Sequence, residues 1–419
     1  SINLYNGDRG TNYPSKKDYQ FSGVPFINAG AIVDGELNEA EFNYISEEKY
    51  DALRAGKIQQ GDILYCLRGS LGKTAIVHQK FKGAISSSLC ILRANQSLLK
   101  EYLYYLLCSN VIGHQQVLAE NGSAQPNLSA ASVMDYMIPL SPLAEQHRIV
   151  DRIESLFAKL DEARQKAQDA LDSFETRKAA ILHRAFTGEL TAQWRKEHGV
   201  GMESWENLKI GTYAQVKGGK RLPKGHKLVT ERTAHPYLRI ADFGDGTIND
   251  SDLHYITEDT FSQIKNYIIN KEDVYISIVG SIGKAGVIPE SLNGANLTEN
   301  AARIISSRTL PRYLSSFLSS PKAQNDIQNR IRSATLGKLS LLNIKDIETP
   351  VPSIEEQTEI IRILDNLLAK EQQAKEAAEG VLEQIDLIKK AILTRAFRGE
   401  LGTNDPSEES AVELLKQVL

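Results

Sequence analysis

An internal duplication constrains this chain more than any other feature of its sequence. When the sequence is shifted by 211 residues, residues 139–190 fall on residues 350–401 without a gap, and 20 of these 52 positions are identical. The same shift superposes Gly69-Ser-Leu-Gly-Lys73 on Gly280-Ser-Ile-Gly-Lys284, whereas the rest of residues 1–138 and 212–349 share only scattered landmarks. An internal sequence repeat of this kind indicates that one structural unit occurs more than once in the chain. We therefore predict two copies of one fold, with a common frame and two divergent recognition regions.

One element of the second copy has no partner in the first. The segment Trp205-Glu-Asn-Leu208 would match residues before position 1, and the chain begins with Ser. We therefore expect the native N-terminus to be longer or to have been trimmed.

The closely matched segments carry a helical pattern. From about residue 142 to 186, and again in the copy, apolar residues recur at alternating steps of three and four, which is typical of a coiled-coil seam. The predicted seam comprises Ile149, Ile153, Leu156, Leu160, Ala163, Ala167, Ala170 and Phe174, and then Ile360, Leu364, Leu367, Glu371, Ala374, Ala378, Val381, Ile385, Ile388 and Ile392. Glu371 either faces a partner or extends into solvent.

The sequence indicates where these two helices begin and end, and it predicts that they pair with each other. Pro142 precedes the first, Ser353 can cap the second, and Gly188 and Gly399 lie where each must stop. Roughly 40 residues at about 1.5 Å each give rods of about 60 Å. Because a domain of about 150 residues lies between the helices, we expect them to pair with each other in antiparallel orientation.

The regions between the helices are predicted to be rich in strands. Residues 61–67 and 272–279 are β-branched and aromatic and are bounded by turn residues, and short helices are expected at 46–54, 98–108 and 311–319. The predicted fold class is α+β: two mixed α/β domains related by duplication and separated by two long helices. The predicted boundaries are 1–141, 142–198, 199–350, 351–404 and 405–419, the last including a short amphipathic helix at Ser410–Leu419.

Composition excludes several classes of protein. The 419 residues carry 49 basic and 53 acidic side chains, a net charge of −4, so the chain is no simple polycation. No apolar run approaches the about 18 to 20 residues needed to cross a bilayer, and the first ten residues are too polar for a secretory signal. Cys66, Cys90 and Cys108 fit no metal-ligand spacing. We expect three free thiols, no membrane partner and a cytoplasmic location.

Catalytic motifs are incomplete or missing. The segment 68–74 resembles the end of a phosphate-binding P-loop, but Leu67 replaces the first glycine, and Ile278 and Ala285 break the motif in the copy. A tight turn between strands is the simpler interpretation. Asp242-Phe-Gly244 lacks the other kinase motifs, and H-E-x-x-H, G-x-S-x-G and N/D-P-P-Y/F do not occur. We predict no catalytic residue, bound cofactor or metal.

Basic and amide side chains gather in the divergent regions. Residues 205–240 contain Lys209, Lys217, Lys220, Arg221, Lys224, Lys227, Arg232 and Arg239. A second cluster, Arg330, Arg332 and Lys338, lies in a predicted loop at 329–338. In the first domain we expect a polar arm with Arg9, Asn12, Tyr13, Lys16 and Lys17, and a flexible loop rich in amides at 121–127. Such side chains on loops can hold phosphates or contact base edges, although a solvated basic face is the alternative for any one of them. The predicted DNA-contacting residues are Arg9, Asn12, Tyr13, Lys16, Lys17, Ser70, Lys73, Gln125, Asn127, Lys217, Lys220, Arg221, Lys224, Ser281, Lys284, Arg330, Arg332 and Lys338.

Two repeated motifs resemble those of the specificity subunit of Type I restriction–modification enzymes, the HsdS family. The first is the helix start Pro142-Leu-Ala-Glu-Gln146, repeated as Ser353-Ile-Glu-Glu-Gln357. The second is the helix end A-F-x-G-E-L, which the first copy extends from Phe186 to Arg195 as F-T-G-E-L-T-A-Q-W-R. Gly-Asp-Ile-Leu64 followed by the G-S-x-G-K segment is also similar to the variable domains of that family, and the likeness covers nearly the whole chain.

The resemblance implies a function. Each variable region would be a target-recognition domain for one half of a bipartite, gapped site in double-stranded DNA. The two helices would form a spacer that fixes the half-site separation and docks two methyltransferase subunits, with motor-nuclease subunits joining in the restricting complex. S-adenosylmethionine, ATP and Mg would be bound by those partners, and this chain would be non-catalytic. A rod of about 60 Å is long enough to separate two domains by one turn of DNA, ~34 Å, or more.

Two other classes of function remain open from the residues alone. A coiled-coil scaffold whose variable domains bind proteins is favoured by the low net basicity, and it predicts no salt-dependent affinity for DNA. An enzyme with an unrecognised site would instead convert a substrate as the isolated protein.

Overall fold

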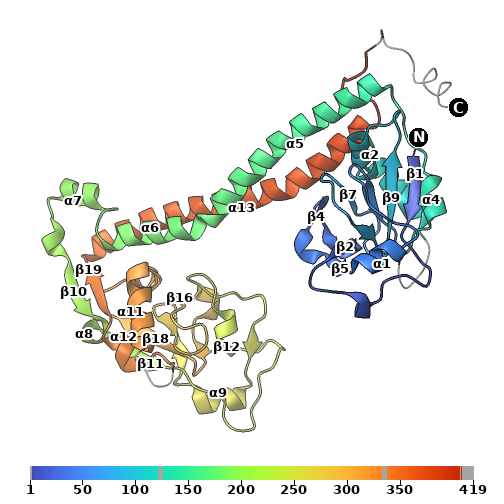
Figure 1. Ribbon diagram of the computed structural model, residues 1–419. Helices are drawn as coiled ribbons and strands as arrows, with labels where there is room; N and C mark the ends of the chain where they lie inside the picture. Colours follow the sequence, from blue (N-terminus) through green and yellow to red (C-terminus); the bar gives the residue numbers. More distant parts are fainter. Residues whose placement is uncertain (1, 121–125, 333–336, 406, 408–419) are drawn as a thin grey trace. The chain divides into compact units, whose positions relative to one another are not determined.

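The computed structural model describes residues 2–120, 126–332, 337–405 and 407 (Figure 1). It divides into two compact units. Unit 1 consists of Ser1–Gln168 and Glu379–Leu419, and unit 2 of Asp169–Ala378. Each unit therefore combines one variable region with segments of both long helices, whereas the sequence boundaries set the helices apart as separate domains. The predicted C-terminal helix at Ser410–Leu419 lies outside the described residues.

Unit 1 is built on a four-stranded antiparallel sheet in the order β1-β9-β6-β7. A three-stranded sheet in the order β5-β2-β8, a small β3-β4 ribbon and short helices complete it. These elements are β1 (Ile2–Asn6), β2 (Val24–Ile27), β3 (Ile32–Val33), β4 (Glu36–Leu37), β5 (Asn43–Ile45), α1 (Glu47–Ala52), β6 (Ile63–Cys66), β7 (Thr74–Ile76), β8 (Ala84–Ile85), β9 (Leu89–Ala94), α2 (Lys100–Leu107), α3 (Asn110–Ala119) and α4 (Ala130–Met134).

Unit 2 repeats this plan. Its sheets have the orders β11-β18-β15-β16 and β13-β12-β17-β14, and a further antiparallel pair joins β10 to β19. The elements are β10 (Glu206–Lys209), α8 (Ile210–Tyr213), β11 (Ala214–Gly218), β12 (Pro236–Leu238), β13 (His254–Tyr255), α9 (Glu258–Ile264), β14 (Ile268–Ile269), β15 (Val274–Ser277), β16 (Ala285–Val287), β17 (Ala295–Leu297), β18 (Ala301–Ser306), α10 (Pro311–Leu318), α11 (Pro321–Arg332), α12 (Leu341–Lys345) and β19 (Glu348–Val351).

The structure confirms the duplication through the regions where the two sequences diverge. The first residues of β6 and β15, of β7 and β16, and of β8 and β17 are each 211 positions apart, as are those of α2 and α10 and of α3 and α11. The strands predicted at 61–67 and 272–279 are present as β6 and β15, and the three predicted short helices are α1, α2 and α10. The same fold therefore accommodates two different sets of loop residues.

The first long helix is interrupted, in contrast to the prediction of one helix from 142 to 186. It consists of α5 (Leu143–Asp172) and α6 (Phe174–Phe186), and α7 (Ala192–His198) follows. At the break, Ser173 Oγ donates a hydrogen bond to the Asp169 carbonyl at 2.7 Å. A serine hydroxyl that bonds to the preceding turn competes with the helix ladder and bends it. The equivalent residue in the copy is Gln384, and there α13 (Ile354–Ala396) is continuous over 43 residues.

Antiparallel pairing of the long helices is confirmed within each unit. In unit 1, Lys389 Nζ of α13 lies 2.5 Å from the Asp161 carboxylate of α5, and Asp386 pairs with Arg164. In unit 2, Arg177 Nε of α6 lies 2.7 Å from the Glu371 carboxylate of α13. Ascending residue numbers on one helix meet descending numbers on the other. The contact with Arg177 also accounts for Glu371, whose place in the seam the sequence left open.

The predicted seam is wrong in part of the second helix, where Ala374, Val381 and Ile388 are exposed. Ile149, Ile153, Ala167, Phe174, Ile360, Leu364, Ala378 and Ile385 are buried, and Leu156, Leu160 and Leu367 are half-buried. Val381 and Ile388, however, are 40% and 43% exposed, and Lys389 lies 4.9 Å from the ring centre of Phe157. A seam with a step of three residues and then four, and a seam with a step of four and then three, both include the buried residues Ala378 and Ile385. The position of the partner helix therefore decides between them, and the sequence of α13 alone does not.

The core of each unit includes the helix end that belongs to the other copy. Phe186, at the end of α6, packs edge-on against Tyr313 of α10 at 5.3 Å between ring centres. The ring of Phe397, just after α13, packs in the same way against Tyr102 of α2 at 5.1 Å. Leu182 and Ala185 accompany the first contact in unit 2, and their duplicates accompany the second in unit 1. The repeated A-F-x-G-E-L motif thus closes both cores.

Candidate nucleic-acid interface

The repeated G-S-x-G-K segment is a hairpin loop in both units. It joins β6 to β7 and β15 to β16, and its glycines adopt φ of +75° to +92°, a region that other residues rarely occupy. Lys73 Nζ donates to the Ile32 carbonyl at 3.2 Å, and Lys284 Nζ donates to the Phe243 carbonyl at 3.3 Å. Ile32 and Phe243 are themselves 211 residues apart. The same lysine contact therefore stabilises the same loop twice.

The geometry of this loop is not that of a P-loop. A phosphate-binding P-loop leads from a strand into a helix, whose first N–H groups bind the phosphates. Here the loop leads into another strand, as the interpretation of a tight turn required. Both lysines remain on the exposed rim beside the exposed Ser70 and Ser281.

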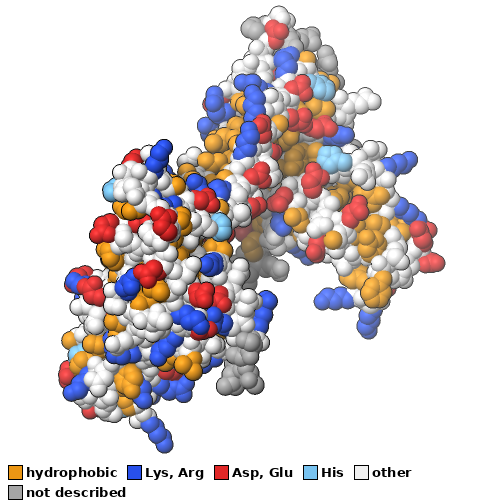
Figure 2. Space-filling view, turned by 90° about the vertical axis from the view of Figure 1, so that its left-hand side faces the viewer, with side chains coloured by type: hydrophobic (Ala, Val, Ile, Leu, Met, Phe, Trp, Pro, Cys, Tyr) orange, Lys and Arg blue, Asp and Glu red, His pale blue; other side chains and the backbone are white. Residues whose placement is uncertain are grey.

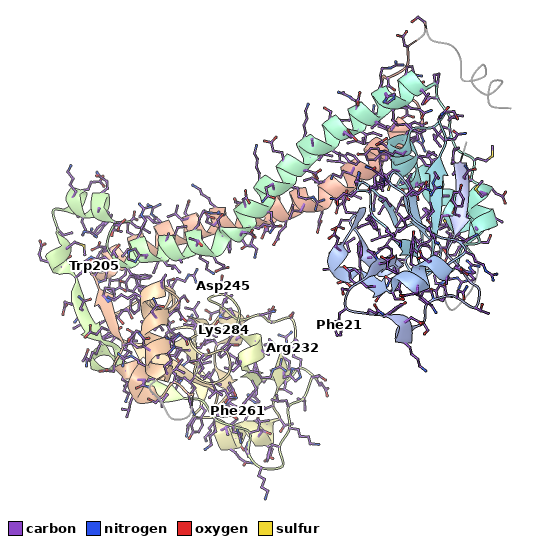
Figure 3. All side chains as sticks on the ribbon, in the orientation of Figure 1. Phe21, Trp205, Arg232, Asp245, Phe261 and Lys284 are labelled. Carbon is purple, nitrogen blue, oxygen red and sulfur yellow. The ribbon has the colours of Figure 1, made fainter. Side chains whose placement is uncertain are left out.

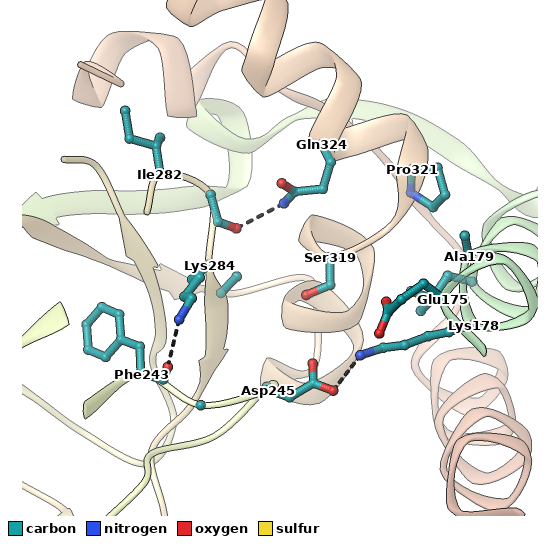
Figure 4. Close-up of a pocket in the computed structure, with 15 residues that line it drawn as sticks. Glu175, Lys178, Ala179, Phe243, Asp245, Ile282, Lys284, Ser319, Pro321 and Gln324 are labelled. Atoms are coloured by element: carbon teal, nitrogen blue, oxygen red, sulfur yellow. Dashed lines mark hydrogen bonds and ion pairs between the residues drawn. The ribbon is translucent and has the colours of Figure 1, made fainter. Parts of the chain in front are cut away.

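A cavity of about 490 Å³ adjoins this loop in unit 2 (Figure 4). Lys178 of α6 forms an ion pair there with Asp245, and Gln324 Nε2 donates to the Gly283 carbonyl at 2.9 Å. With Lys284 bound to Phe243, the polar groups of the cavity mostly bind one another. The arrangement holds the hairpin and α6 together and presents no free cluster of cations.

The predicted polar arm of unit 1 divides into exposed and structural residues. Arg9, Lys16 and Lys17 are exposed. Asn12, in contrast, donates to the Ala52 carbonyl at 3.0 Å. Tyr13 packs edge-on against Phe26 at 5.7 Å, and its hydroxyl accepts a hydrogen bond from the Ser87 backbone. Asn12 and Tyr13 therefore fix the arm to the domain, and the three cations are the side chains that it presents.

The amide-rich loop before α4 is described only in part. Gln125 lies outside the described residues. Asn127 Oδ1 accepts a hydrogen bond from Arg68 Nε at 3.2 Å, and the two residues also form a backbone bridge. Arg68 was not among the predicted contact residues. Its place immediately before the repeated glycine-serine motif is the one feature of the sequence that could have pointed to it.

The basic arm of unit 2 presents most of its cations to solvent. Lys217, Lys220, Arg221 and Lys224 are all exposed. Arg221 Nε lies 2.7 Å from the Glu299 carboxylate, while 79% of the arginine side chain stays exposed. Burial tends to raise the pKa of Glu299, but the hydrogen bond from Arg221 prevails and holds that pKa below its ordinary value. Lys220 Nζ lies 5.4 Å from the ring centre of Tyr267.

The second predicted cluster of unit 2 is a helix end and not a loop. Arg330 and Arg332 belong to α11, and Lys338 follows the undescribed residues 333–336. Arg330 is half-buried and forms ion pairs with Asp326 at 3.0 Å and Asp346 at 2.9 Å. Arg332 and Lys338 are exposed. The loop prediction for 329–332 was wrong because the helical run of α11 continues to Arg332, and Arg330 mainly holds α11 against α12.

Charge is mixed over the visible surface. On the face shown in Figure 2, Lys and Arg side chains alternate with Asp and Glu and form no continuous cationic field. This distribution matches the net charge of −4. On this face, contact with a polyanion would therefore come from local groups of cations.

The repeated helix-start glutamines attach each variable region to its helix. Gln146 is fully buried, accepts from the Leu99 N–H at 2.8 Å and donates to the Ser97 and Ser141 carbonyls. Gln357 makes the equivalent three bonds, including one from the Leu310 N–H at 2.8 Å. Three hydrogen bonds therefore attach each variable region to its helix.

A buried ionic network stabilises the helix exit in unit 2. Arg195 Nη1 lies 2.6 Å from Glu356 Oε1, with 8% and 1% of the two side chains exposed. Thr191 Oγ1 donates to the same oxygen at 2.7 Å, and Trp205 Nε1 donates to Glu356 Oε2 at 2.9 Å. The network joins the two repeated motifs, since Thr191 and Arg195 come from one and Glu356 from the other.

Two further classes of site were sought in the described part of the chain. No helix there is long and apolar enough to span a membrane. Nor do those residues bring together three or more His, Cys, Asp or Glu side chains as a possible metal site. The three cysteines are free thiols, as predicted.

Comparisons with known proteins agree with this architecture. The family model described as Type I restriction modification DNA specificity domain matches residues 5–170 and again 202–380. The chain is 25% identical to the type I restriction enzyme EcoBI specificity subunit of Escherichia coli, over 99% of this chain and 89% of that protein. For the EcoKI specificity subunit of Escherichia coli strain K12, the identity is 24% over 99% and 91%.

A solved structure shares the fold. The HsdS subunit from Thermoanaerobacter tengcongensis superposes with a TM-score of 0.64 at 21% identity, covering 96% of this chain and 97% of that one. The fold and the two loop-bearing regions define a duplicated recognition protein. The chain belongs to the family of type I restriction modification DNA specificity domains, and it contains that domain twice.

Proposed function

We propose that this chain is the non-catalytic DNA-specificity subunit of a type I restriction–modification complex, in which each unit reads one half of a bipartite site in double-stranded DNA. The observation that carries the proposal is the doubled family domain on two units whose main four-stranded sheets correspond and whose loops differ. Equal frames with different loops suit the recognition of two different half-sites. Arg9, Lys16 and Lys17 in one unit and the arm at 217–224 in the other supply exposed cations for phosphates and base edges.

The paired helices suit the role of spacer and docking platform. At about 1.5 Å per residue, the 43 residues of α13 span about 65 Å, which exceeds the ~34 Å of one DNA turn. Val381, Leu387 and Ile388 of α13 are 40% to 65% exposed and offer an apolar strip to a partner. We assign this strip to a methyltransferase subunit, and we expect two such subunits, joined by motor-nuclease subunits in the restricting complex.

Chemistry would then reside in the partners. S-adenosylmethionine, ATP and Mg are expected on the methyltransferase and motor-nuclease subunits. A chain of mixed surface charge can still recognise DNA in such a complex, because the other subunits contribute to the attraction for phosphates.

Mapping of methylated adenines by single-molecule sequencing, with and without this gene, tests the proposal. The expected result is the loss of one bipartite, gapped motif, which also yields both half-sites. An unchanged methylome, with the partner methyltransferase expressed and active, would contradict it and favour a scaffold that binds proteins.

A reciprocal pair of variants tests the division between units. With Lys220→Glu plus Arg221→Glu, we expect the complex to stop recognising the half-site of unit 2. Lys16→Glu plus Lys17→Glu should affect the other half-site only. The measurement is binding to four DNAs in which neither, one, the other or both half-sites are scrambled. Methylation of the intact site at the normal rate by the first variant would refute this assignment.

A further inference from the structure

One aromatic side chain of unit 1 lies entirely outside the fold. Phe21 is 107% exposed relative to a reference chain, and Figure 3 shows it at the edge of the unit. Its neighbours Tyr13 and Tyr19 pack against Phe26 at 5.7 and 6.2 Å between ring centres. The loop thus packs two of its three aromatic rings against the domain and presents the third. An isolated exposed phenylalanine has no role in the stability of its own domain.

The loop that carries Phe21 is held at both ends. The Gln20 N–H donates to the Tyr44 carbonyl at 2.9 Å, and Val24 pairs with Ile45 in the β2-β5 ladder. Gly23 has φ +141°, and a side chain there would meet the Ile45 carbonyl oxygen at 2.5 Å. Only glycine fits this approach. Phe21 therefore projects from a three-residue bend whose ends are fixed to β5.

Unit 2 has a corresponding loop that is two residues longer between its anchors. The Val229 N–H donates to the Tyr255 carbonyl at 2.9 Å, and Ile256 bonds to the His235 carbonyl at 3.0 Å. Tyr255 and Tyr44 are duplicates, 211 residues apart, so both loops are suspended from the same place. In the second loop the residue 211 positions after Phe21 is Arg232, which is also exposed.

The surroundings of Phe21 favour nucleic acid over protein as its partner. Gln20 and Ser22 are exposed polar neighbours, and Lys16 and Lys17 are exposed on the preceding turn. A protein-binding hot spot lies within an apolar surface that excludes water, which is not the case here. Proteins that kink DNA insert a single apolar wedge between base pairs while nearby cations hold the phosphates. Arginine, at the duplicate position, is itself a side chain that enters the minor groove.

We propose that Phe21 is an intercalating wedge that inserts between adjacent base pairs of double-stranded DNA at the half-site read by unit 1. The inference rests on the proposed DNA-recognition function and deepens it. Unstacking a base step opposes binding, so the wedge must be rigidly presented, as its fixed loop allows. The half-site of unit 1 is therefore distorted at one step, while Arg232 makes a polar contact without unstacking at the half-site of unit 2.

The test uses the full chain in complex with its methyltransferase subunits and DNA containing 2-aminopurine at one position at a time. Unstacking raises the fluorescence of this base. The methylated adenine serves as an internal control, because methyltransferases extrude their target base. At saturating protein we expect one further position in the first half-site to brighten. Phe21→Ala should abolish that signal, weaken binding about 10-fold, and leave the signal at the methylated adenine intact.

Matched variants separate a wedge from other roles. Phe21→Leu keeps an apolar wedge and should retain much of the extra signal. Lys16→Ala plus Lys17→Ala should weaken binding but keep the full signal once DNA is saturated. If the methylated adenine brightens and no other position depends on Phe21, or if Phe21→Ala reduces assembly with the methyltransferase, the wedge is overturned. If no position brightens and binding ignores sequence, the proposed function itself fails.

Discussion

Replacement of Glu356 by alanine should destabilise unit 2 strongly. The carboxylate is the common acceptor of Arg195, Thr191 and Trp205, at 2.6, 2.7 and 2.9 Å. Its removal leaves a guanidinium that is 8% exposed without a counter-ion. Breaking a buried ion pair by removing one partner costs about 3–5 kcal/mol. With a urea m-value of about 2 kcal/mol per molar, the unfolding midpoint should fall by about 1.5–2.5 M.

Two matched controls exist in the same chain. The Arg177–Glu371 pair has side chains 37% and 21% exposed, so Glu371→Ala should cost only about 0.2–1 kcal/mol. Glu145 is the duplicate of Glu356, but Gly402 replaces the equivalent threonine, so Glu145→Ala should also have a small effect.

Tryptophan fluorescence is a direct assay for this network. The chain has two tryptophans, Trp194 and Trp205. Trp194 is stacked on His198, and Trp205 is hydrogen-bonded to Glu356, so the emission reports this corner of unit 2. Urea titrations of the wild type, Glu356→Ala and Glu371→Ala then give the comparison. Because Glu145 lies in unit 1, Glu145→Ala is followed by circular dichroism instead. A midpoint for Glu356→Ala no lower than that of Glu371→Ala would refute the reasoning. A second substitution, Arg195→Met, should restore part of the loss by removing the orphaned charge.

Three further outcomes follow from the same contacts. Gln146→Leu removes the hydrogen bonds to the Leu99 N–H and to the Ser97 and Ser141 carbonyls, so the free energy of unfolding of unit 1 should fall by about 2–4 kcal/mol. Thermal unfolding followed by circular dichroism measures this loss, and an unchanged transition would count against the role of Gln146. Ile153→Asp, at a fully buried position, should prevent folding of unit 1, whereas Val381→Asp should fold normally and fail to co-purify with the methyltransferase. Hydrogen bonds from the backbone of Arg54 and then Gly10 hold the pKa of Asp8 below its ordinary value. Asp8 therefore stabilises the fold above its ordinary pKa, and this contribution disappears as pH falls through the lowered value; Asp8→Asn should flatten the acid limb of the stability curve, and an unaltered limb would contradict the assignment.

The frame of this protein could be predicted from the sequence because duplication provides its own control. A helix or strand expected in one copy is tested by the residues 211 positions away, and β6 with β15 and α2 with α10 satisfied both. The antiparallel helices followed from the same logic. The break in the first long helix was harder to predict. Ser173 is one of many polar residues on its helix, and only the hydrogen bond from its hydroxyl to the Asp169 carbonyl distinguishes it.

The candidate contact residues were less predictable, because residue type does not reveal how a side chain is used. Lys16 and Arg330 look equivalent in sequence, yet Lys16 is exposed and Arg330 is half-buried between two aspartates. Tyr13 and Phe21 are both aromatic residues of one polar arm, yet Tyr13 packs on Phe26 and Phe21 packs on nothing that the structure describes. A side chain becomes available to a ligand only when tertiary contacts do not already occupy it.

In both copies the repeated helix ends can vary in sequence less than the loop tips can, and the packing explains why. Phe186 must fit Tyr313, and Phe397 must fit Tyr102, so each repeated helix end has to match the variable region of the other copy. Gln146 and Gln357 likewise must each satisfy three backbone groups at fixed positions. A change at any of these sites leaves a void or an unpaired polar group in a core. The loops between the strands are not constrained in this way: Phe21 and Arg232 lie 211 positions apart in the sequence and are both exposed. A chain organised in this way can change what it recognises at the loop tips without changing how its two units are built.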